Sequence, residues 1–485
     1  MSVLPKGWER TSLQNLVVVN YGKALPEQAR NAEGSIPVFG SSGVVGKHDA
    51  AITSGPSVIV GRKGAAGAVH LVDRPCWPID TAYFIEPPAG LSVRWLHYFL
   101  GSQQLVRLDK STAIPSLSRD DLYNELVPVA PELEQGRVLE KLEELLSDLD
   151  AGEAELKAAQ KKLTQYRQSL LKAAVEGALT APWREQQRAQ HPPAESGAQL
   201  LQRILTERRA RWEAKQLAKF EAQGKAPPKD WQKKYPEPVQ PDTTDMPALP
   251  QGWVWASVAQ LGEVTTGFTP STSDPKNFGG GIPFFKPTDL DAGYEVRSSR
   301  ESLTEAGAST GRVLPAGSIL VTCIGATIGK TGLARVPCAT NQQINAVSVD
   351  RVNVLPEFLY WMICSGFGQR QIIGNASATT LPILNKSKFE KVALPLPPLS
   401  EQREIVSLIE GEVDRLRHLG ESLIHASLQS TAQRQNILRA AFSGQLVPQD
   451  PNDEPAADLL ARIRAERAAQ APVRKPRGRR AQEAA

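Results

Sequence analysis

The segment CIGATIGKTG, at positions 323–332, has the residue types of a phosphate-binding loop, because it follows a β-branched run and contains Gly-Lys-Thr. A P-loop needs four residues between its first glycine and that triplet, so that backbone N–H groups can surround a phosphate. Gly325 stands one residue too close, and Ile324 occupies the position where the glycine belongs. We therefore expect a glycine-rich turn after a strand, and a P-loop-like NTPase is the alternative.

Other catalytic signatures are missing from the sequence. The six histidines have no metal-ligand spacing, and neither Gly-x-Ser-x-Gly nor His-Glu-x-x-His occurs. The cysteines are dispersed without a Cys-x-x-Cys pair, at Cys76, Cys323, Cys338 and Cys364. Their dispersal, together with an N-terminus that has no apolar signal core, predicts a reducing, cytoplasmic setting. We expect no catalytic, cofactor-binding or metal site, which favours a recognition or scaffold protein.

Length and charge set only broad bounds. A chain of 485 residues exceeds one hydrophobic core and predicts two to four domains. Lys and Arg number 56 against 52 Asp and Glu, a net charge of +4 that does not by itself indicate nucleic acid. No apolar run approaches the roughly 20 residues that span a bilayer, so we expect a soluble protein without a membrane partner.

The chain contains an internal repeat. Leu4-Pro-Lys-Gly-Trp8 returns as Leu249-Pro-Gln-Gly-Trp253, and Ile36-Pro-Val-Phe39 returns as Ile282-Pro-Phe-Phe285. From the pair 114–117 and 381–384 to the pair 177–179 and 444–446, the two copies match at a constant offset of 267, which is 382 minus 115. The stretches 20–110 and 265–380 align poorly. Each half therefore pairs a divergent globular part with a closely matched C-terminal part.

The matched part has the pattern of a long helix. Leucines recur every seven residues in the first copy, at Leu142, Leu149, Leu156, Leu163 and Leu170, with a companion row at Leu145, Gly152, Ala159, Tyr166 and Ala173. The second copy has Ile409, Leu416, Leu423, Ser430 and Ile437, with Ile405, Leu419, Ala426 and Ala440 beside them. Such heptads predict a coiled coil between two rods of about 60 Å, and ordinary core helices are the alternative.

Three further segments complete the chain. Residues 196–222 are expected to form a charged helix, with Arg208, Arg209 and Arg211 on a solvated face. The proline-rich segment 225–250 is typical of a semi-rigid linker, and 474–480 forms a basic tail. Trp8 and Trp253 are expected to be packed inside the protein.

In this order and repeated twice, these motifs resemble the DNA-specificity subunit of type I restriction-modification systems. The resemblance extends over nearly the whole chain, through the Leu-Pro-x-Gly-Trp start of each half, the Leu-Pro-Leu-Pro-Pro-Leu-Ser-Glu-Gln run ending at Gln402, the heptads and the Lys-Ala-Ala-x-x-Gly-x-Leu close. The first copy departs slightly from the run that ends at Gln402. It reads Val-Pro-Val-Ala-Pro-Glu-Leu-Glu-Gln and ends at Gln135.

The resemblance implies an α+β protein in which two α/β-type target-recognition domains are joined by helices forming an antiparallel coiled coil, with pseudo-two-fold symmetry. The implied domains are the first target-recognition domain (1–131), the first coiled-coil region (132–182), a charged helix and linker (183–245), the second target-recognition domain (246–398), the second coiled-coil region (399–448), and a C-terminal helix and tail (449–485).

The resemblance also implies a function and partners. Each recognition domain would read one half of a bipartite, asymmetric site in double-stranded DNA, and the coiled coil would set the spacer. Two copies of a methyltransferase subunit would dock on the frame and methylate adenine, with a restriction and translocase subunit added. SAM, ATP and Mg would then belong to the partner subunits, and this chain would be non-catalytic. A coiled-coil adaptor that binds only proteins is a further alternative.

Candidate DNA contacts follow from side-chain chemistry. Polar and basic residues in glycine-flanked loops can reach phosphates or guanine edges, and Asn or Gln can pair with adenine through two hydrogen bonds. The first domain offers Ser41, Ser42, Arg62, Lys63 and His70. The second domain offers Lys286, Thr288, Lys330, Asn341, Gln342 and Gln343.

Overall fold

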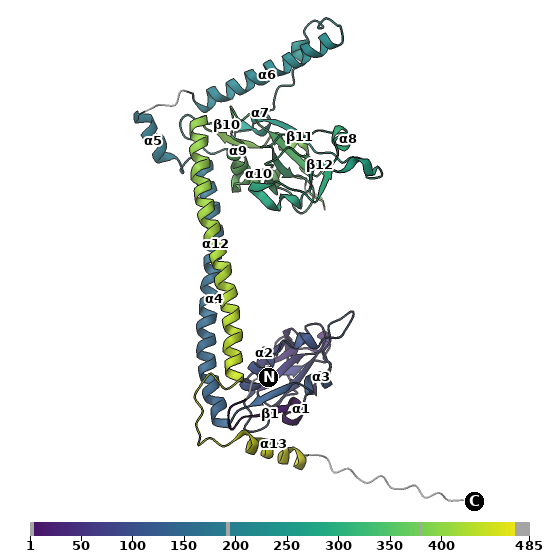
Figure 1. Ribbon diagram of the computed structural model, residues 1–485, viewed down its shortest axis with the longest axis vertical. Helices are drawn as coiled ribbons and strands as arrows, with labels where there is room; N and C mark the ends of the chain where they lie inside the picture. The colour runs from purple at the N-terminus through teal and green to yellow at the C-terminus, as the bar shows by residue number, and fades with distance from the viewer. Residues whose placement is uncertain (1–3, 191–194, 378–380, 471–485) are drawn as a thin grey trace, which may run out of the picture. The chain divides into compact units, whose positions relative to one another are not determined.

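The computed structural model describes residues 4–190, 195–377 and 381–470, and it divides into two compact units. Unit 1 consists of residues 1–158 and 423–485, and unit 2 consists of residues 159–422. Each unit holds one globular domain, formed by residues 4–131 in unit 1 and 249–398 in unit 2, together with parts of two long helices (Figure 1). The basic segment 474–480 lies outside the described residues.

The first globular domain contains two main sheets. One has the strand order β2 (Asn20–Tyr21), β8 (Ala82–Ile85), β5 (Ser57–Gly61), β6 (Val69–Val72), and its neighbours are antiparallel. The other has the order β4 (Gly43–His48), β3 (Ile36–Gly40), β7 (Trp77–Pro78), in which β3 and β7 are parallel. Strand β5 is buried along its whole length, as its β-branched sequence predicts.

The second globular domain repeats this topology despite its different sequence. Its four-stranded sheet has the order β11 (Glu263–Thr266), β17 (Ile344–Ser348), β14 (Ile319–Thr322), β15 (Thr331–Leu333). Its three-stranded sheet has the order β13 (Glu301–Leu303), β12 (Phe278–Phe285), β16 (Ala339–Thr340), again with one parallel pair. The predicted α+β class and the internal repeat are confirmed.

A short antiparallel strand pair closes each domain. In unit 1, β1 (Glu9–Ser12) pairs with β9 (Leu126–Val129), and in unit 2, β10 (Val254–Ser257) pairs with β18 (Ala393–Leu396). The tryptophan that precedes each first strand is buried, with Trp8 5% and Trp253 8% exposed. Both were expected to be packed, and both are.

Helices cover the sheets and supply much of the core. In unit 1 these are α1 (Leu13–Leu16), α2 (Val93–Ser102) and α3 (Arg119–Tyr123), and in unit 2 they are α7 (Val258–Leu261), α8 (Glu305–Ser309), α9 (Pro356–Cys364), α10 (Gly366–Asn375) and α11 (Lys386–Phe389). Helix α2 places Trp95 in the first core, and α9 places Trp361 in the second.

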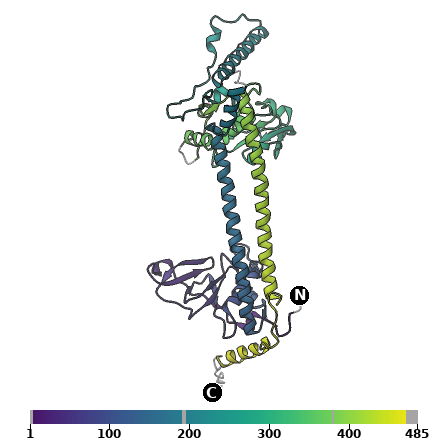
Figure 2. The same ribbon diagram turned by 90° about the vertical axis from the view of Figure 1, so that its left-hand side faces the viewer.

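Two long helices follow the closing strands. Helix α4 (Glu132–Val175) and helix α12 (Leu399–Phe442) each contain 44 residues and lie side by side (Figures 1 and 2). In unit 1, Ser430 Oγ donates to Glu153 Oε1 at 3.1 Å, and Arg434 forms an ion pair with Asp150. As the residue number rises from 430 to 434 on α12, the partner on α4 falls from 153 to 150. The two helices therefore run antiparallel, as predicted.

The predicted heptad seam is confirmed in part. Leu142 and Ile409, which share the 267-residue offset, are fully buried. Two members of the expected companion rows are not in the seam, since Tyr166 is 50% and Leu419 54% exposed. An α-helix has 3.6 residues per turn, so a fixed seven-residue row drifts around a helix that is not fully supercoiled.

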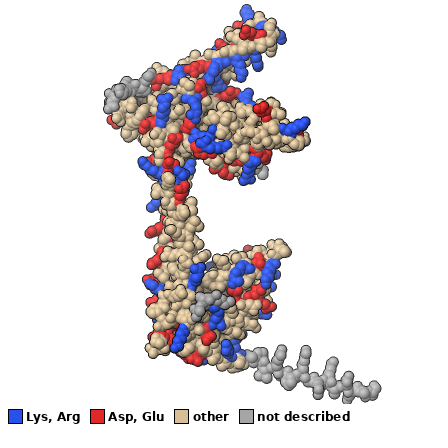
Figure 3. Space-filling model, viewed as in Figure 1, with Lys and Arg blue, Asp and Glu red and all other residues tan. Residues whose placement is uncertain are grey.

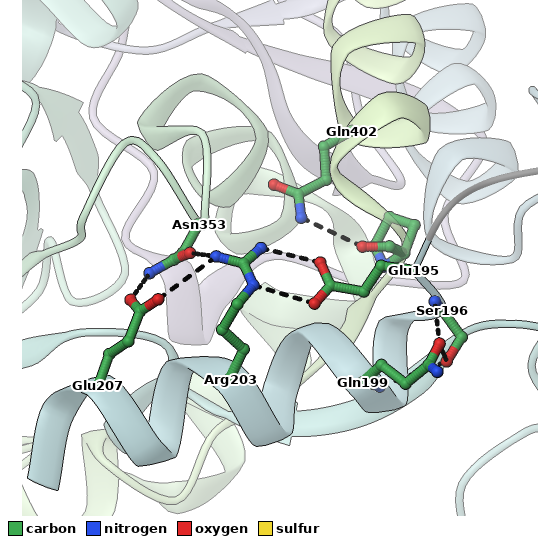
Figure 4. Close-up of polar contacts among 8 residues, drawn as sticks. Glu195, Ser196, Gln199, Arg203, Glu207, Asn353 and Gln402 are labelled. Atoms are coloured by element: carbon green, nitrogen blue, oxygen red, sulfur yellow. Dashed lines mark hydrogen bonds and ion pairs between the residues drawn. The ribbon is translucent and has the colours of Figure 1, made fainter.

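The charged helix expected after the first coiled-coil segment is α6 (Gly197–Ala222), which follows α5 (Ala181–Gln190). Figure 4 shows how α6 is fixed to the second domain. Arg203 donates to both oxygens of Glu195, at 2.9 and 2.8 Å, and also contacts the buried Asn353, whose Nδ2 donates to Glu207 Oε2 at 2.7 Å. Helix α6 is therefore an integral part of unit 2.

The prediction of a solvated face on α6 was wrong for Arg208, which is half-buried and donates to the backbone oxygens of Ala259 and Gly262. Arg211 is exposed as expected, with 59% of its side chain accessible, and forms a 3.0 Å ion pair with Asp350. Only a helix docked on a domain can bring these groups together, and the charge pattern of α6 does not reveal that docking. The corresponding helix of unit 1, α13 (Ala456–Gln470), buries Leu459 and Ile463 in the first core.

Candidate nucleic-acid interface

The same loop follows the central strand of each domain. In the first domain Gly64 N donates to Pro115 O at 2.9 Å, and in the second Gly325 N donates to Pro382 O at 3.0 Å. The loop closes in both through a glycine N–H to the last strand residue, from Gly67 to Gly61 and from Gly329 to Thr322. These glycines have positive φ of 82° to 91°, which a side chain disfavours.

This geometry answers the question of the Gly-Lys-Thr triplet. A P-loop connects a strand to a helix, whose N-terminus faces the phosphates. Here Thr331 instead begins strand β15, which pairs antiparallel with β14. The glycine-rich turn is confirmed, and the alternative of a P-loop-like NTPase is wrong for this segment.

The candidate residues of the first domain lie in neighbouring loops. Ser41 and Ser42 form the turn between β3 and β4, while Arg62 and Lys63 begin the loop after β5. His70, on β6, has Nε2 3.3 Å from Ser41 O, which joins the two regions. The structure therefore brings all five residues to one end of the two sheets.

The candidates of the second domain lie at the matching end. Lys286 and Thr288 follow β12, where Ser41 and its neighbours follow β3, and Lys330 lies before β15. Lys330 Nζ is 2.5 Å from Asp291 Oδ1, in the short helical segment η5 (Asp289–Glu295) that begins after Thr288. A third loop, with Asn341, Gln342 and Gln343, enters β17 beside it; Gln343 O accepts from Cys323 N at 2.8 Å.

The three amides of this third loop have different environments. Asn341 is 8% exposed, and its side chain hydrogen-bonds Gln343 twice, through Nδ2 to Oε1 at 3.0 Å and through Oδ1 from the backbone N at 3.2 Å. Gln342 is exposed and accepts from Thr269 Oγ1. Asn341 thus shapes the loop, and Gln342 presents its amide to solvent.

Sequence reasoning missed two residues of the first domain. Tyr21, 47% exposed, is close to two guanidinium groups, those of Arg62 and Arg119, each 5.0 Å from its ring centroid. Arg62 Nη1 also donates to Asp80 O at 3.0 Å, which fixes its orientation. Aromatic and guanidinium planes can stack on bases, so this cluster suits nucleic acid. Residues 21, 62 and 119 are too far apart in sequence for any motif to link them.

Ion pairs moderate the charge of the second interface. Lys286 pairs with Glu301 as Lys330 does with Asp291. The carboxylates are exposed, and such surface pairs contribute only about 0–1 kcal/mol, so a phosphate can replace the acidic partner at small cost. The face of the molecule drawn in Figure 3 likewise carries basic and acidic side chains interspersed.

The thiol nearest this interface is held neutral. Cys323 is 3% exposed and its Sγ donates to Gln343 O at 3.1 Å. Burial raises the pKa of Cys323 to about 11, so the thiol is not an activated nucleophile at neutral pH. Among residues 4–190, 195–377 and 381–470, no group of three or more His, Cys, Asp or Glu side chains could hold a metal ion.

Comparison with known proteins establishes the family. Residues 5–160 and 250–416 match the family described as type I restriction modification DNA specificity domain, and the chain belongs to that family. The two matched regions include both globular domains and the first parts of both long helices.

Individual relatives agree over most of the length. The chain is 23% identical over 481 residues to the type I restriction enzyme EcoDI specificity subunit of Escherichia coli, covering 96% of each chain. It is 26% identical to the EcoBI specificity subunit of the same species, covering 74% of this chain and 68% of that one. A solved structure titled for complex assembly and conformational transition of the type I R-M system matches with a TM-score of 0.63 at 17% identity, covering 92% of this chain and all of the other.

No helix within the described part of the chain is both long and apolar enough to cross a membrane.

Proposed function

We propose that this chain is the DNA-specificity subunit of a type I restriction-modification complex, and that each globular domain reads one half of a bipartite site. The observation that carries the proposal is the pairing of one topology with two loop chemistries. Positions with the same backbone hydrogen bonds hold Arg62 in the first domain and Cys323 in the second, and likewise Thr81 and Gln343. Two such readers would recognise different half-sites, which makes the site asymmetric.

The long helices are proposed to act as the spacer. Helices α4 and α12 are unbroken over 44 residues and pair antiparallel, so their length is a fixed quantity of the molecule. A rigid element suits the purpose because half-sites on one face of B-DNA repeat at about 34 Å per turn. Family membership implies DNA and partner subunits, and we propose two methyltransferase copies with a restriction and translocase subunit.

The chemistry of methylation and cleavage is proposed to reside in the partners. SAM, ATP and Mg would bind there, and this chain would direct adenine methylation without catalysing it. Within the chain, Arg62 and Gln342 are proposed as base contacts because both side chains lie at the loop surface. Lys63, Lys286 and Lys330 are proposed as phosphate contacts, while Asn341 and His70 support the loops.

The experiment that tests this function is a single-molecule methylation map of the host genome with and without the gene. Loss of one bipartite motif, with adenine modified in both halves, is the expected result. Complementation with a variant changed only at Arg62 and Lys63 should alter one half of that motif and leave the other intact. An unchanged map in a strain that demonstrably makes the complex would contradict the proposal and favour an adaptor that binds only proteins.

A further inference from the structure

The two units differ at one buried carboxylate. In unit 2, Glu401 is 2% exposed and accepts three hydrogen bonds, from Thr180 Oγ1 at 2.7 Å, Arg184 Nη1 at 2.5 Å and Trp253 Nε1 at 2.8 Å. The Arg184 guanidinium also donates from Nη2 to Gly177 O at 2.6 Å and lies 5.5 Å from the Trp253 ring centroid. A cation from the chain itself therefore neutralises this carboxylate.

The corresponding place in unit 1 has the same acceptors, but no residue in the described part of the chain supplies such a cation. Glu134, 267 residues before Glu401, is 1% exposed, and its Oε1 has no hydrogen-bond partner among the residues that the structure describes. Trp8 Nε1, whose counterpart Trp253 Nε1 donates to Glu401, is also buried and makes no hydrogen bond within the described ranges. The carbonyl of Gly444, the counterpart of Gly177, accepts at 2.7 Å from the neutral Gln449 Nε2 instead of from an arginine.

A cavity lies beside these groups. Its volume is about 430 Å³, and its lining includes Trp8, Glu134 and Gln449. The remaining charged lining residues are three acids and one base, namely Glu9, Asp450, Asp453 and Lys6. The nearby Arg137 is already paired with Asp453. Burial raises the pKa of Glu134, while the nearby Trp8 and Gln449 side chains and the charge of Arg137 act in the opposite direction.

We propose that this cavity of unit 1 binds a guanidinium group, held by the Glu134 carboxylate and by the face of Trp8. The fork of N–H donors matches a carboxylate, and its plane can lie on an indole ring, as the Arg184 group does in unit 2. The group has two possible sources: an arginine side chain of a partner protein, or an arginine of this chain's own segment 471–485, which contains Arg474, Arg477, Arg479 and Arg480. The proposal does not depend on which DNA sequence the domains read.

Methylguanidinium is the probe, and ¹⁹F NMR of the full chain labelled with 5-fluorotryptophan is the readout. Addition of the probe at constant ionic strength should shift the Trp8 resonance saturably, and methylammonium should bind at least tenfold more weakly. Glu134→Gln should abolish the response. Gln449→Arg should also abolish it and raise the melting temperature, because it supplies the guanidinium internally, whereas the charge-matched control Gln445→Arg, outside the cavity lining, should do neither.

The reciprocal variant tests the same idea in unit 2. Arg184→Gln should lower the melting temperature and create a second response, at the Trp253 resonance. A chain ending at Gln470 separates the sources: binding that appears only after truncation assigns the site to the chain's own arginines, and equal binding by both chains assigns it to an outside arginine. If neither chain binds the probe and Gln449→Arg does not stabilise the protein, the proposal is wrong.

Discussion

The two units share a frame, which consists of the sheets and the long helices α4 and α12, and they differ in their loops. In both, the glutamine after the buried glutamate links the start of the long helix to its domain in the same way: Gln135 accepts from Ser92 N and Gln402 accepts from Leu355 N, each at 3.1 Å. Each amide also donates to a backbone oxygen five residues earlier, at 3.0 and 3.1 Å. Backbone contacts of this kind tolerate change elsewhere, so the loops could diverge without altering the frame.

The difference also shows which residues a shared backbone requires. Gly22 and Gly267 are the same position in the two domains, and a Cβ there would lie 2.0 Å from Ile79 O and 2.1 Å from Asn341 O. The glycine persists because two backbone segments touch, while the neighbouring Asp80 and Gln342 are free to differ. The side chains that face solvent are therefore the ones that distinguish the two domains.

The largest effect should come from altering the shared frame while leaving both sets of loops intact. Inserting one heptad after Leu156 lengthens α4 by about 10 Å and shifts its register against α12. We expect a changed spacer between the half-sites, or complete loss of binding. The measurement is selection of bound sequences from a library with variable spacers, and full activity on the original spacer would contradict the helices' role.

A matched pair of core truncations tests whether the two frames are energetically equal. Leu142→Ala and Ile409→Ala remove fully buried side chains at equivalent places on α4 and α12. Each should cost about 2–5 kcal/mol of stability, whereas Leu419→Ala, at a position 54% exposed, should stay within about 0.5 kcal/mol. Calorimetric unfolding of the three variants measures this, and a large loss in only one of the core variants would show that the frames are not equivalent.

Loop substitutions should sharpen the contrast between the domains. Arg62→Ala should weaken DNA binding by about 1–3 kcal/mol and relax one position in one half-site, as expected for a base contact. Lys330→Ala should leave sequence choice unchanged and reduce the salt slope by about one, as expected for a phosphate contact. Binding isotherms of the assembled complex at several salt concentrations separate the two, and wild-type binding by both variants would refute the assignments.

The smallest effect concerns Cys323, which occupies in the second domain the position that Arg62 occupies in the first. The folded pKa of Cys323, about 11, lies above its ordinary value of 9.0, so burial of the neutral thiol stabilises the fold fully below pH 9. That contribution should disappear as pH rises from about 9 to about 11. At pH 8, iodoacetamide should label Cys323 far more slowly in the folded than in the unfolded protein, as mass spectrometry can follow; equal rates would contradict its burial.

Local patterns predicted much of the architecture. The Leu-Pro-x-Gly-Trp starts, the 267-residue offset and the heptad leucines are short-range features, and they indicated the duplication, the packed tryptophans and the long helices. The missing P-loop glycine at Ile324 likewise predicted a turn. These inferences succeeded because helix periodicity and turn geometry are fixed by neighbouring residues.

The loop clusters depend on contacts across the fold. Tyr21 meets Arg62 and Arg119 only because three separate segments converge at one sheet end, and Arg208 leaves solvent only because α6 docks on the second domain. The sequence by itself determined that the chain is built from two copies of one unit. Tertiary structure decided that Arg184 pairs with the buried Glu401, because such pairing depends on side chains distant in sequence meeting in a low-dielectric interior.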